Sequence, residues 1–292
     1  MKRWLRAENG RVWVRVAGVL AVVVGLMGGA GRAWAQEEKL PKAEKILERS
    51  IEAQGGREAF DKLTSRVSKG TLEIMIGEPG PTGPAVKGGP QVSKATMTRY
   101  EAAPNKRYVM VDFGDEGKIE QGSDGETHWE LPPMGEARIL EGEEKVNSER
   151  QSVFNAFLHW RELYQKVECT GKEDVGDRSC YKVEMTPATG AAVTMYFDRK
   201  TGLPVKTATV RKGDKGDIQI QTVLDDFKSV DGVMLAHKTT RQVTGGGPMQ
   251  TITTILTSVE HNSAIPADRF ALPDQVKMLK DKPKAETKPA AG

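Results

Sequence analysis

A single amphipathic segment, residues 147–167, lies between two long stretches of the chain that show strand-like patterns. At 100° per residue, the apolar side chains of this segment fall on one stripe: Val153, Phe154, Phe157, Leu158, Trp160 and Tyr164. Asn147 or Ser148 can serve as the N-cap, and Ser148 has capping-box spacing to Gln151. The pattern predicts one helix over residues 147–167. This helix constrains the fold because its apolar stripe must pack against strands from both sides.

The stretches on both sides alternate apolar and polar residues between turn signals, as strands with one buried face do. In residues 217–228, for example, Ile218 and Ile220 share a face opposite Gln219 and Gln221. The expected strands before the central segment are 67–76, 91–101, 107–113, 118–121 and one that ends at residue 130, with 138–140 left unassigned. The expected strands after it are 166–170, 179–186, 192–198, 203–212, 217–228, 233–243 and 249–261. Short turns between them predict antiparallel neighbours in one sheet.

Helical patterns are otherwise confined to residues 42–54 and 57–63, and residues 77–90 are predicted to form a loop. About ten strands with so few helices predict an α+β fold dominated by β structure. A sheet of this size that does not close should curl strongly. We therefore expect an open half-barrel: a strongly curved antiparallel sheet with helices covering its concave side.

The domain organisation follows from the same patterns. Residues 36–275 are predicted to form this single domain, closed by a turn over 266–273 that docks Phe270 and Leu272. Residues 276–292 are rich in Lys, Pro and Ala, and we expect them to be disordered.

The first 35 residues have the pattern of a signal peptide. A basic beginning precedes an apolar run over residues 16–30, and Ala33 and Ala35 form an A-x-A cleavage signal before Gln36. We expect cleavage after Ala35 and export to the periplasm or out of the cell; an uncleaved membrane anchor is the alternative. No cysteine follows the cleavage site, so a lipid anchor is not expected.

The charge balance of the chain depends on this leader. Residues 1–35 carry six basic residues and one acidic residue, so their removal changes the formal net charge from +3 to −2. The basic character therefore belongs to the export signal, and it gives no reason to expect a nucleic-acid partner.

The two cysteines, Cys169 and Cys180, flank a polar turn between two expected strands. A hairpin that turns at Asp174 and Val175 would place the cysteines opposite each other, within bridging distance. In an exported protein, this spacing predicts a disulfide between Cys169 and Cys180. A redox-active pair is disfavoured because the spacing is not C-x-x-C.

Motifs for catalysis or metal binding are missing from the sequence. The four histidines show no metal-ligand spacing, whether between themselves or with cysteines: His128, His159, His237 and His261. There is no G-x-S-x-G motif, and the formal S-x-x-K at Ser179–Lys182 falls on an expected strand, where the two side chains do not meet. We expect neither a metal, a cofactor nor an enzymatic activity; a hydrolase with a dispersed site stays open as an alternative.

Four segments together resemble a known family: IEAQGGREAFDKL, GSDGETHWE, YFDRKTGLPVK and DDFKSVDGVMLAHK. With the signal peptide, they resemble the LolA/LolB-like group of exported bacterial proteins, the outer-membrane lipoprotein-sorting proteins. The resemblance covers most of residues 40–272 in order and spacing. It implies an open β-barrel around helices, whose apolar inner surface holds acyl chains of lipoproteins. This chain departs from those carriers in its length, its insertion at residues 77–90 and its two cysteines.

We therefore expect a non-catalytic carrier or binding protein for lipoprotein acyl chains or another lipid. Its expected cavity lining is Val153, Phe154, Phe157, Leu158, Trp160, Arg161, Tyr164 and Trp129. Arg161 lies inside the apolar arc, where it can extend to solvent, pair with a carboxylate or meet a ligand head group. The alternative is a cell-envelope interaction or scaffold module with a packed core. We expect a monomer, with an envelope protein as a possible further partner.

Overall fold

The computed structural model describes residues 39–78, 89–213 and 216–281. The predicted signal peptide, most of the predicted loop at 77–90 and the last part of the predicted tail lie outside these residues. All described elements belong to one compact unit that begins at Leu40.

The described strands form one antiparallel sheet of 13 strands, in the order β6-β5-β4-β3-β2-β1-β13-β12-β11-β10-β9-β8-β7. The first meander comprises β1 (Ser65–Glu78), β2 (Gln91–Ala102), β3 (Lys106–Asp112), β4 (Lys118–Ser123), β5 (His128–Leu131) and β6 (Arg138–Ile139). The second comprises β7 (Lys166–Val175), β8 (Arg178–Thr186), β9 (Val193–Asp198), β10 (Pro204–Gly213), β11 (Gly216–Val230), β12 (Val233–Thr244) and β13 (Met249–His261). The predicted strands are confirmed, with ends that shift by a few residues.

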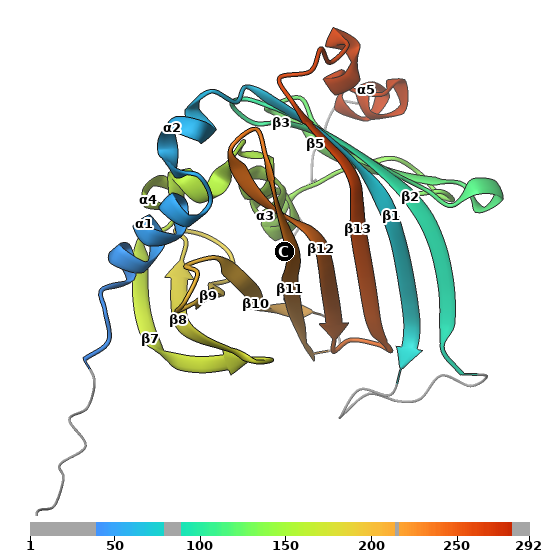
Figure 1. The fold of residues 1–292 in the computed structure, drawn as a ribbon. Helices are drawn as coiled ribbons and strands as arrows, with labels where there is room; N and C mark the ends of the chain where they lie inside the picture. Colours follow the sequence, from blue (N-terminus) through green and yellow to red (C-terminus); the bar gives the residue numbers. More distant parts are fainter. Residues whose placement is uncertain (1–38, 79–88, 214–215, 282–292) are drawn as a thin grey trace, which may run out of the picture. The chain divides into compact units, whose positions relative to one another are not determined.

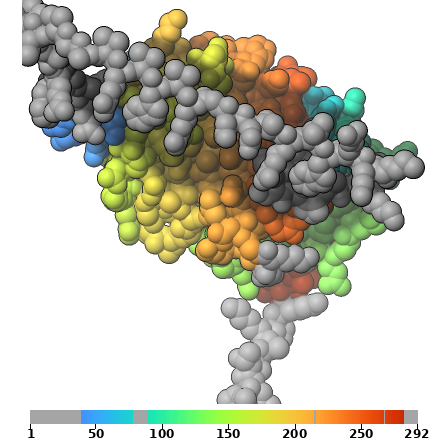
Figure 2. Space-filling model, turned by 90° about the horizontal axis from the view of Figure 1, so that it is seen from below, coloured from blue at the N-terminus to red at the C-terminus, as the bar shows by residue number. Residues whose placement is uncertain are grey.

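The two meanders join where β13 pairs with β1, and the view from below shows the cyan and orange-red strands side by side (Figure 2). The edge strands β6 and β7 do not pair with each other, so the sheet remains open. The segment that connects β6 to β7 must therefore cross from one edge to the other. The expected half-barrel with a helical cover is confirmed (Figure 1).

Two short helices precede the sheet, α1 (Ala43–Ala53) and α2 (Gly56–Asp61). Gly55 separates them with a φ of 119°, and a Cβ there would collide with the carbonyl oxygen of Gly232. Only glycine fits this close, left-handed turn. The turn also anchors the helix pair to β12, because the Met234 N–H donates to the Gln54 carbonyl oxygen at 2.8 Å.

The central segment is not the single helix that its periodicity predicts. It forms α3 (Gly142–Ser152), the 3-10 turn η2 (Ala156–His159) and α4 (Trp160–Leu163). Two long-range bonds explain the break: the Phe154 N–H donates to the Pro104 carbonyl at 2.8 Å, and Arg66 donates to Asn155 Oδ1 at 2.7 Å. Asn155 adopts a φ of 52°, a left-handed conformation that asparagine tolerates.

The predicted N-caps of this segment were also wrong. The helix begins earlier, with Glu141 at the N-cap position and without a side-chain cap bond. Asn147 Oδ1 instead accepts a hydrogen bond from Arg150 at 2.7 Å. The Ser148 hydroxyl lies 2.9 Å from His128 Nδ1 on β5, which ties α3 to the sheet.

Cross-strand register shows which side chains share a face, because directly opposed residues point to the same side of a sheet. Met195 on β9 packs on the core beneath α1 and opposes Thr207 on β10. The same row continues through Thr222, Arg241, Ile252 and Ile74. This row marks the concave face, and the residues between its members mark the outer face.

The outer face is covered at one end by the 3-10 turn η3 (Ala267–Phe270) and α5 (Asp274–Asp281), whereas η1 (Gly114–Glu116) follows β3. Phe270 and Leu272 dock there as the sequence predicts. The prediction of disorder from residue 276 onward was wrong for 276–281, because Val276 is fully buried against Tyr108 and Trp129 and holds α5 in place (Figure 1).

The predicted disulfide is also corrected, since Cys169 and Cys180 are both free. The β7–β8 hairpin turns after Val175, which pairs with Arg178, and a β-bulge shifts the register between Cys169 and Gly171. Cys169 therefore opposes Val183, and Cys180 opposes Glu173. Cys169 contacts the core on the concave side, whereas Cys180 lies in a separate cluster with Tyr196. A disulfide needs Cβ atoms that point toward each other, and two cysteines on opposite faces of a sheet cannot meet this requirement.

Candidate functional site

The helical cover is held together at the carboxylate of Glu48 on α1. Glu48 Oε1 accepts hydrogen bonds from Arg161 Nη1 at 2.8 Å, Arg57 Nη2 at 3.1 Å and Trp160 Nε1 at 3.2 Å. Burial alone would raise the pKa of Glu48, but the hydrogen bonds from Arg161, Arg57 and Trp160 lower it on balance. Of the roles considered for Arg161, pairing with a carboxylate is thus the one observed. The guanidinium also stacks on the Trp160 ring, 4.2 Å from its centroid.

The aromatic residues of the central segment pack into cores at the end of the sheet near α1 and α2. Trp160, only 4% exposed, joins α1, β8 and β9, and the Phe157 and Phe197 rings lie 6.1 Å apart. Tyr164 contacts the same core, and burial raises its pKa. Phe154 packs in a second core with Phe60, Leu63 and Val233, and Leu158 contacts both cores. Val153 instead lines a pocket of about 360 Å³ between α3, α4 and the β8–β9 loop.

Trp129 does not pack with the aromatic residues of the central segment, and its predicted place in the cavity lining was wrong. It opposes Gly122 on β4, which in turn opposes Tyr108 on β3. This row lies on the outer face, where Trp129 is 1% exposed and packs with Tyr108 and Val276 beneath α5. Its neighbour His128 points to the concave side, because successive residues of a strand alternate between faces.

A set of aliphatic side chains on the concave face remains only half-buried and belongs to none of the described cores. This set, here named the aliphatic surface, comprises Leu72, Ile74, Ile76, Val111, Ile119, Ile218, Ile220, Val243 and Ile252. Register makes much of it continuous: Ile220 opposes Val243 across β11 and β12, and Ile252 opposes Ile74 across β13 and β1. The periodicity of the strands predicted an apolar face, but only the structure separates its packed part from its uncovered part.

A buried cluster of charges lies on the same concave face, under the break between α3 and η2. Arg66 Nη1 lies 3.6 Å from Glu101 Oε2, and Arg66 Nε donates to His261 Nε2 at 3.1 Å. Burial lowers the pKa of Arg107 to about 10, with a further contribution from the charge of Arg99. The guanidinium groups of Arg66, Arg99 and Arg107 thus lie near the carboxylate of Glu101, and Asp231 joins the cluster through His261 at 3.0 Å, so this end of the concave face carries more positive than negative charges.

The contact between Ser148 and His128 is the feature that most resembles catalytic geometry. His128 is 3% exposed, its Nε2 lies 3.5 Å from Ser123 Oγ, and burial lowers its pKa. Both ring nitrogens therefore face serine hydroxyls, and no described carboxylate bonds to the ring to orient it as a general base. The arrangement links α3 to β4 and β5. Among the described residues, no group of three or more His, Cys, Asp or Glu side chains is placed to hold a metal ion.

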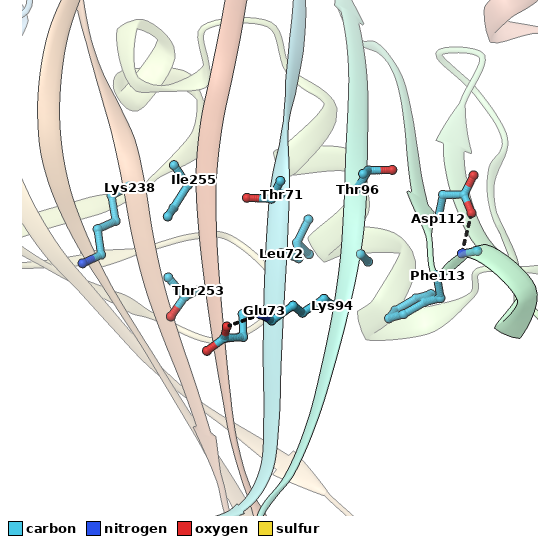
Figure 3. A pocket seen from close by; sticks show the side chains of 12 residues that line it. Thr71, Leu72, Glu73, Lys94, Thr96, Asp112, Phe113, Lys238, Thr253 and Ile255 are labelled. Carbon is cyan, nitrogen blue, oxygen red and sulfur yellow. Dashed lines mark hydrogen bonds and ion pairs between the residues drawn. The ribbon is translucent and has the colours of Figure 1, made fainter.

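A depression of about 660 Å³ lies on the outer face instead (Figure 3). One row across its floor consists of Lys238, Ile255, Thr71, Thr96 and Asp112. Lys94 and Glu73 pair at 3.9 Å in the next row. Four charged side chains line it, and an acyl chain there would have to cover them: Glu73, Lys94, Asp112 and Lys238.

Comparison with solved structures finds similar proteins that cover most of the chain. A DUF1329 family protein from Desulfovibrio piger ATCC 29098 matches with a TM-score of 0.53 at 15% identity, over 79% of this chain and 98% of that one. A LolA superfamily protein from Nitrosomonas europaea matches with a TM-score of 0.52 at 12% identity, over 80% and 99%. The chain therefore shares its fold with these two proteins. A putative outer membrane lipoprotein-sorting protein domain from Vibrio parahaemolyticus matches with a TM-score of 0.52 at 14% identity, over 78% and 97%.

The resemblance seen in the sequence is thus confirmed for the fold. Protein-family models and curated proteins show no match to the chain. None of the helices in the described ranges is long and apolar enough to cross a membrane. At these identities the LolA-like neighbours establish the architecture, and the function must be argued from the concave face itself.

Proposed function

We propose that the protein is an exported, non-catalytic carrier that takes up lipoprotein acyl chains or another lipid on the concave face. The observation that carries this proposal is the aliphatic surface, which lies next to packed cores yet stays half-exposed in the described part of the chain. Burial of apolar surface is worth about 25 cal/mol per Å², or about 0.8 kcal/mol per methylene group. An acyl chain laid along β11, β12, β13 and β1 would gain this energy for each methylene that it buries.

The helical cover gives the proposed carrier a means of release. The break at Val153–Asn155 divides the cover into α3 on one side and η2 with α4 on the other. The second half is tied to α1 through Glu48, whereas α3 is tied to β5 through His128. Movement of one half against the other would open or close the concave face without unfolding either core.

Two measurements test the proposal. Native mass spectrometry of protein purified from its own envelope fraction should show a co-purifying lipid, and a fluorescent fatty-acid analogue should bind to delipidated protein. Ile220→Asn, which places an amide in the aliphatic surface, should weaken probe binding about tenfold. The matched control is Val223→Asn on the outer face of the same strand, where the side chain is 38% exposed. Absence of both a lipid and probe binding would refute the carrier function.

A second candidate is a cell-envelope interaction or scaffold module with a packed interior and no small ligand. The packing of Phe154, Phe157 and Trp160 into cores favours it, because these residues were expected to line a cavity. The same probe experiment distinguishes the two candidates, since a module of this kind would bind no acyl probe. Export itself is tested separately: the mature protein should begin at Gln36.

A further inference from the structure

Two arginines project from the concave face next to the aliphatic surface. Arg211 on β10 opposes Ile218 on β11. Arg241 on β12 opposes Thr222 on one side and Ile252 on the other. Charged residues at positions in phase with an apolar face are rare unless they have a partner. These two positions therefore require an explanation.

Neither guanidinium has such a partner in the described part of the chain. No hydrogen bond or ion pair with a described residue involves Arg211 or Arg241, and the buried Nε of Arg211 lacks an acceptor. Burial lowers the pKa of Arg241, and the charge of Arg211 lowers it further. Two like charges are thus held within electrostatic range of each other, with Arg211 partly buried and Arg241 exposed to solvent, and their repulsion is unfavourable for the empty protein.

Other arginines of the chain form ion pairs with carboxylates. Arg138 bonds to Glu144 at 2.6 Å and to Glu130 at 2.9 Å. On the outer face, Arg178 bonds to Asp225 at 2.8 Å. Both of these arginines have carboxylate partners, which Arg211 and Arg241 lack among the described residues.

An anion with two or more oxygens would supply what is missing. Guanidinium groups form forked hydrogen bonds with phosphates and carboxylates, and these bonds strengthen where water is partly excluded. The neighbouring side chains Ile218, Ile220 and Ile252 would at the same time contact an aliphatic chain attached to that anion. Charge and apolar surface thus specify the two ends of one ligand.

We propose that Arg211 and Arg241 bind the anionic head group, a phosphate or a carboxylate, of an amphiphile whose acyl chain lies on the aliphatic surface. This inference rests on the proposed carrier function and narrows its ligand to acyl lipids that carry an acidic group.

The test compares ligands that differ only in charge. Displacement of a fluorescent acyl probe is measured for oleate, for an oleoyl lysophosphatidic acid and for neutral monoolein. The wild type should bind at least one of the two acidic lipids about tenfold more tightly than monoolein. The one that binds more tightly distinguishes a carboxylate from a phosphate head group. Inorganic phosphate alone should bind far more weakly than the phospholipid.

The variant Arg211→Gln/Arg241→Gln should lose this preference, binding acidic lipids about tenfold or more weakly while its affinity for monoolein changes less than twofold. Arg178→Gln on the outer face is the matched control and should bind like the wild type. Because the double variant removes a repulsion, its melting temperature should equal or exceed that of the wild type. If the double variant does not fold, Arg241→Lys replaces it in the test. This variant keeps the charge but loses the forked hydrogen bonds of a guanidinium group, so its preference for acidic lipids should be intermediate.

The outcomes separate the two proposals. Equal binding of oleate, lysophosphatidic acid and monoolein by the wild type would refute the head-group site and leave the carrier function standing. Retention of the acidic preference in the double variant would refute the assignment to Arg211 and Arg241. Failure of every lipid to bind would refute the carrier function. Binding of inorganic phosphate as tightly as the phospholipid would show an anion site without an amphiphile.

Discussion

Glu48→Ala tests how the helical cover is held on the sheet. The substitution removes the acceptor for the indole N–H of Trp160, a side chain that is 4% exposed, and for two guanidinium groups. A buried donor without a partner costs about 1–3 kcal/mol. The pairs with Arg57 and Arg161 add about 0–1 kcal/mol each, near the low end because both arginine side chains are more than 40% exposed.

Water can reach the vacated position, since the Glu48 side chain is itself 36% exposed. The total loss should therefore be near 2 kcal/mol, which for a domain of this size lowers the melting temperature by about 4–8 °C. The measurement is thermal unfolding followed by circular dichroism at pH 7. Glu44→Ala, an exposed position on the same helix, is the matched control and should melt within about 1 °C of the wild type.

The pH dependence of this difference provides a second check. The folded-state pKa of Glu48 is lowered, so its contribution is fully present above the unfolded-state pKa and is lost as the pH falls through the folded-state value. The difference between wild type and Glu48→Ala should therefore shrink as the pH is lowered from 6 toward 3. Equal melting temperatures for Glu48→Ala and Glu44→Ala at pH 7 would refute the argument that Glu48 holds the cover.

Three further predictions concern other elements. Val276→Asp should lower the free energy of unfolding in urea by more than about 3 kcal/mol and release α5 from the sheet. Met278→Asp, at a position on the same helix that is 65% exposed, should leave the free energy of unfolding unchanged. Equal effects of the two substitutions would contradict the docking of α5 through Val276. Thiol titration of unfolded protein without reductant should find two free thiols, with Cys180 unreactive in the native state because it is fully buried and burial raises its pKa. Absence of both thiols would restore the predicted disulfide. Asn155→Val should lower the free energy of unfolding by about 1–2 kcal/mol or more, because a β-branched residue disfavours a φ of 52°. Asn155→Gly should lower it less. The reverse order would refute the argument that backbone strain at this position matters.

The strand pattern of the chain could be predicted because alternation is a local property. Residues such as Ile218 and Ile220 point to one face whatever the rest of the chain does, so their spacing alone marks a strand and its buried side. The turns between strands then predict antiparallel neighbours. The open sheet followed from these two local signals together with the long segment that separates the two meanders.

The break in the central segment could not be predicted in this way. Its apolar stripe continues without interruption from Val153 to Tyr164, as helical periodicity requires. The break arises from Pro104 and Arg66, which lie far away in the sequence and bond to Phe154 and Asn155. Long-range hydrogen bonds leave no periodic trace in the segment that they distort.

Faces and registers between strands were also decided by the tertiary structure. Trp129 and His128 are neighbours in the sequence, yet one packs beneath α5 and the other beneath α3. A β-bulge between Cys169 and Gly171 places the two cysteines on opposite faces. A displacement of one residue reverses every side chain of a strand, and the sequence of a single strand does not record which partner register it will adopt.

The sequence alone thus determined where strands form, that the sheet is antiparallel and that a helical segment crosses it, because each of these depends on short-range patterns. Arg211 and Arg241 are in phase with an apolar face, a signal visible in the sequence once the face of each strand is known. Within residues 39–78, 89–213 and 216–281, these two arginines lack a counter-charge and the aliphatic surface beside them stays uncovered, and only the tertiary structure decided both properties. Both properties depend on which residues from distant strands come together, and the folded sheet determines that.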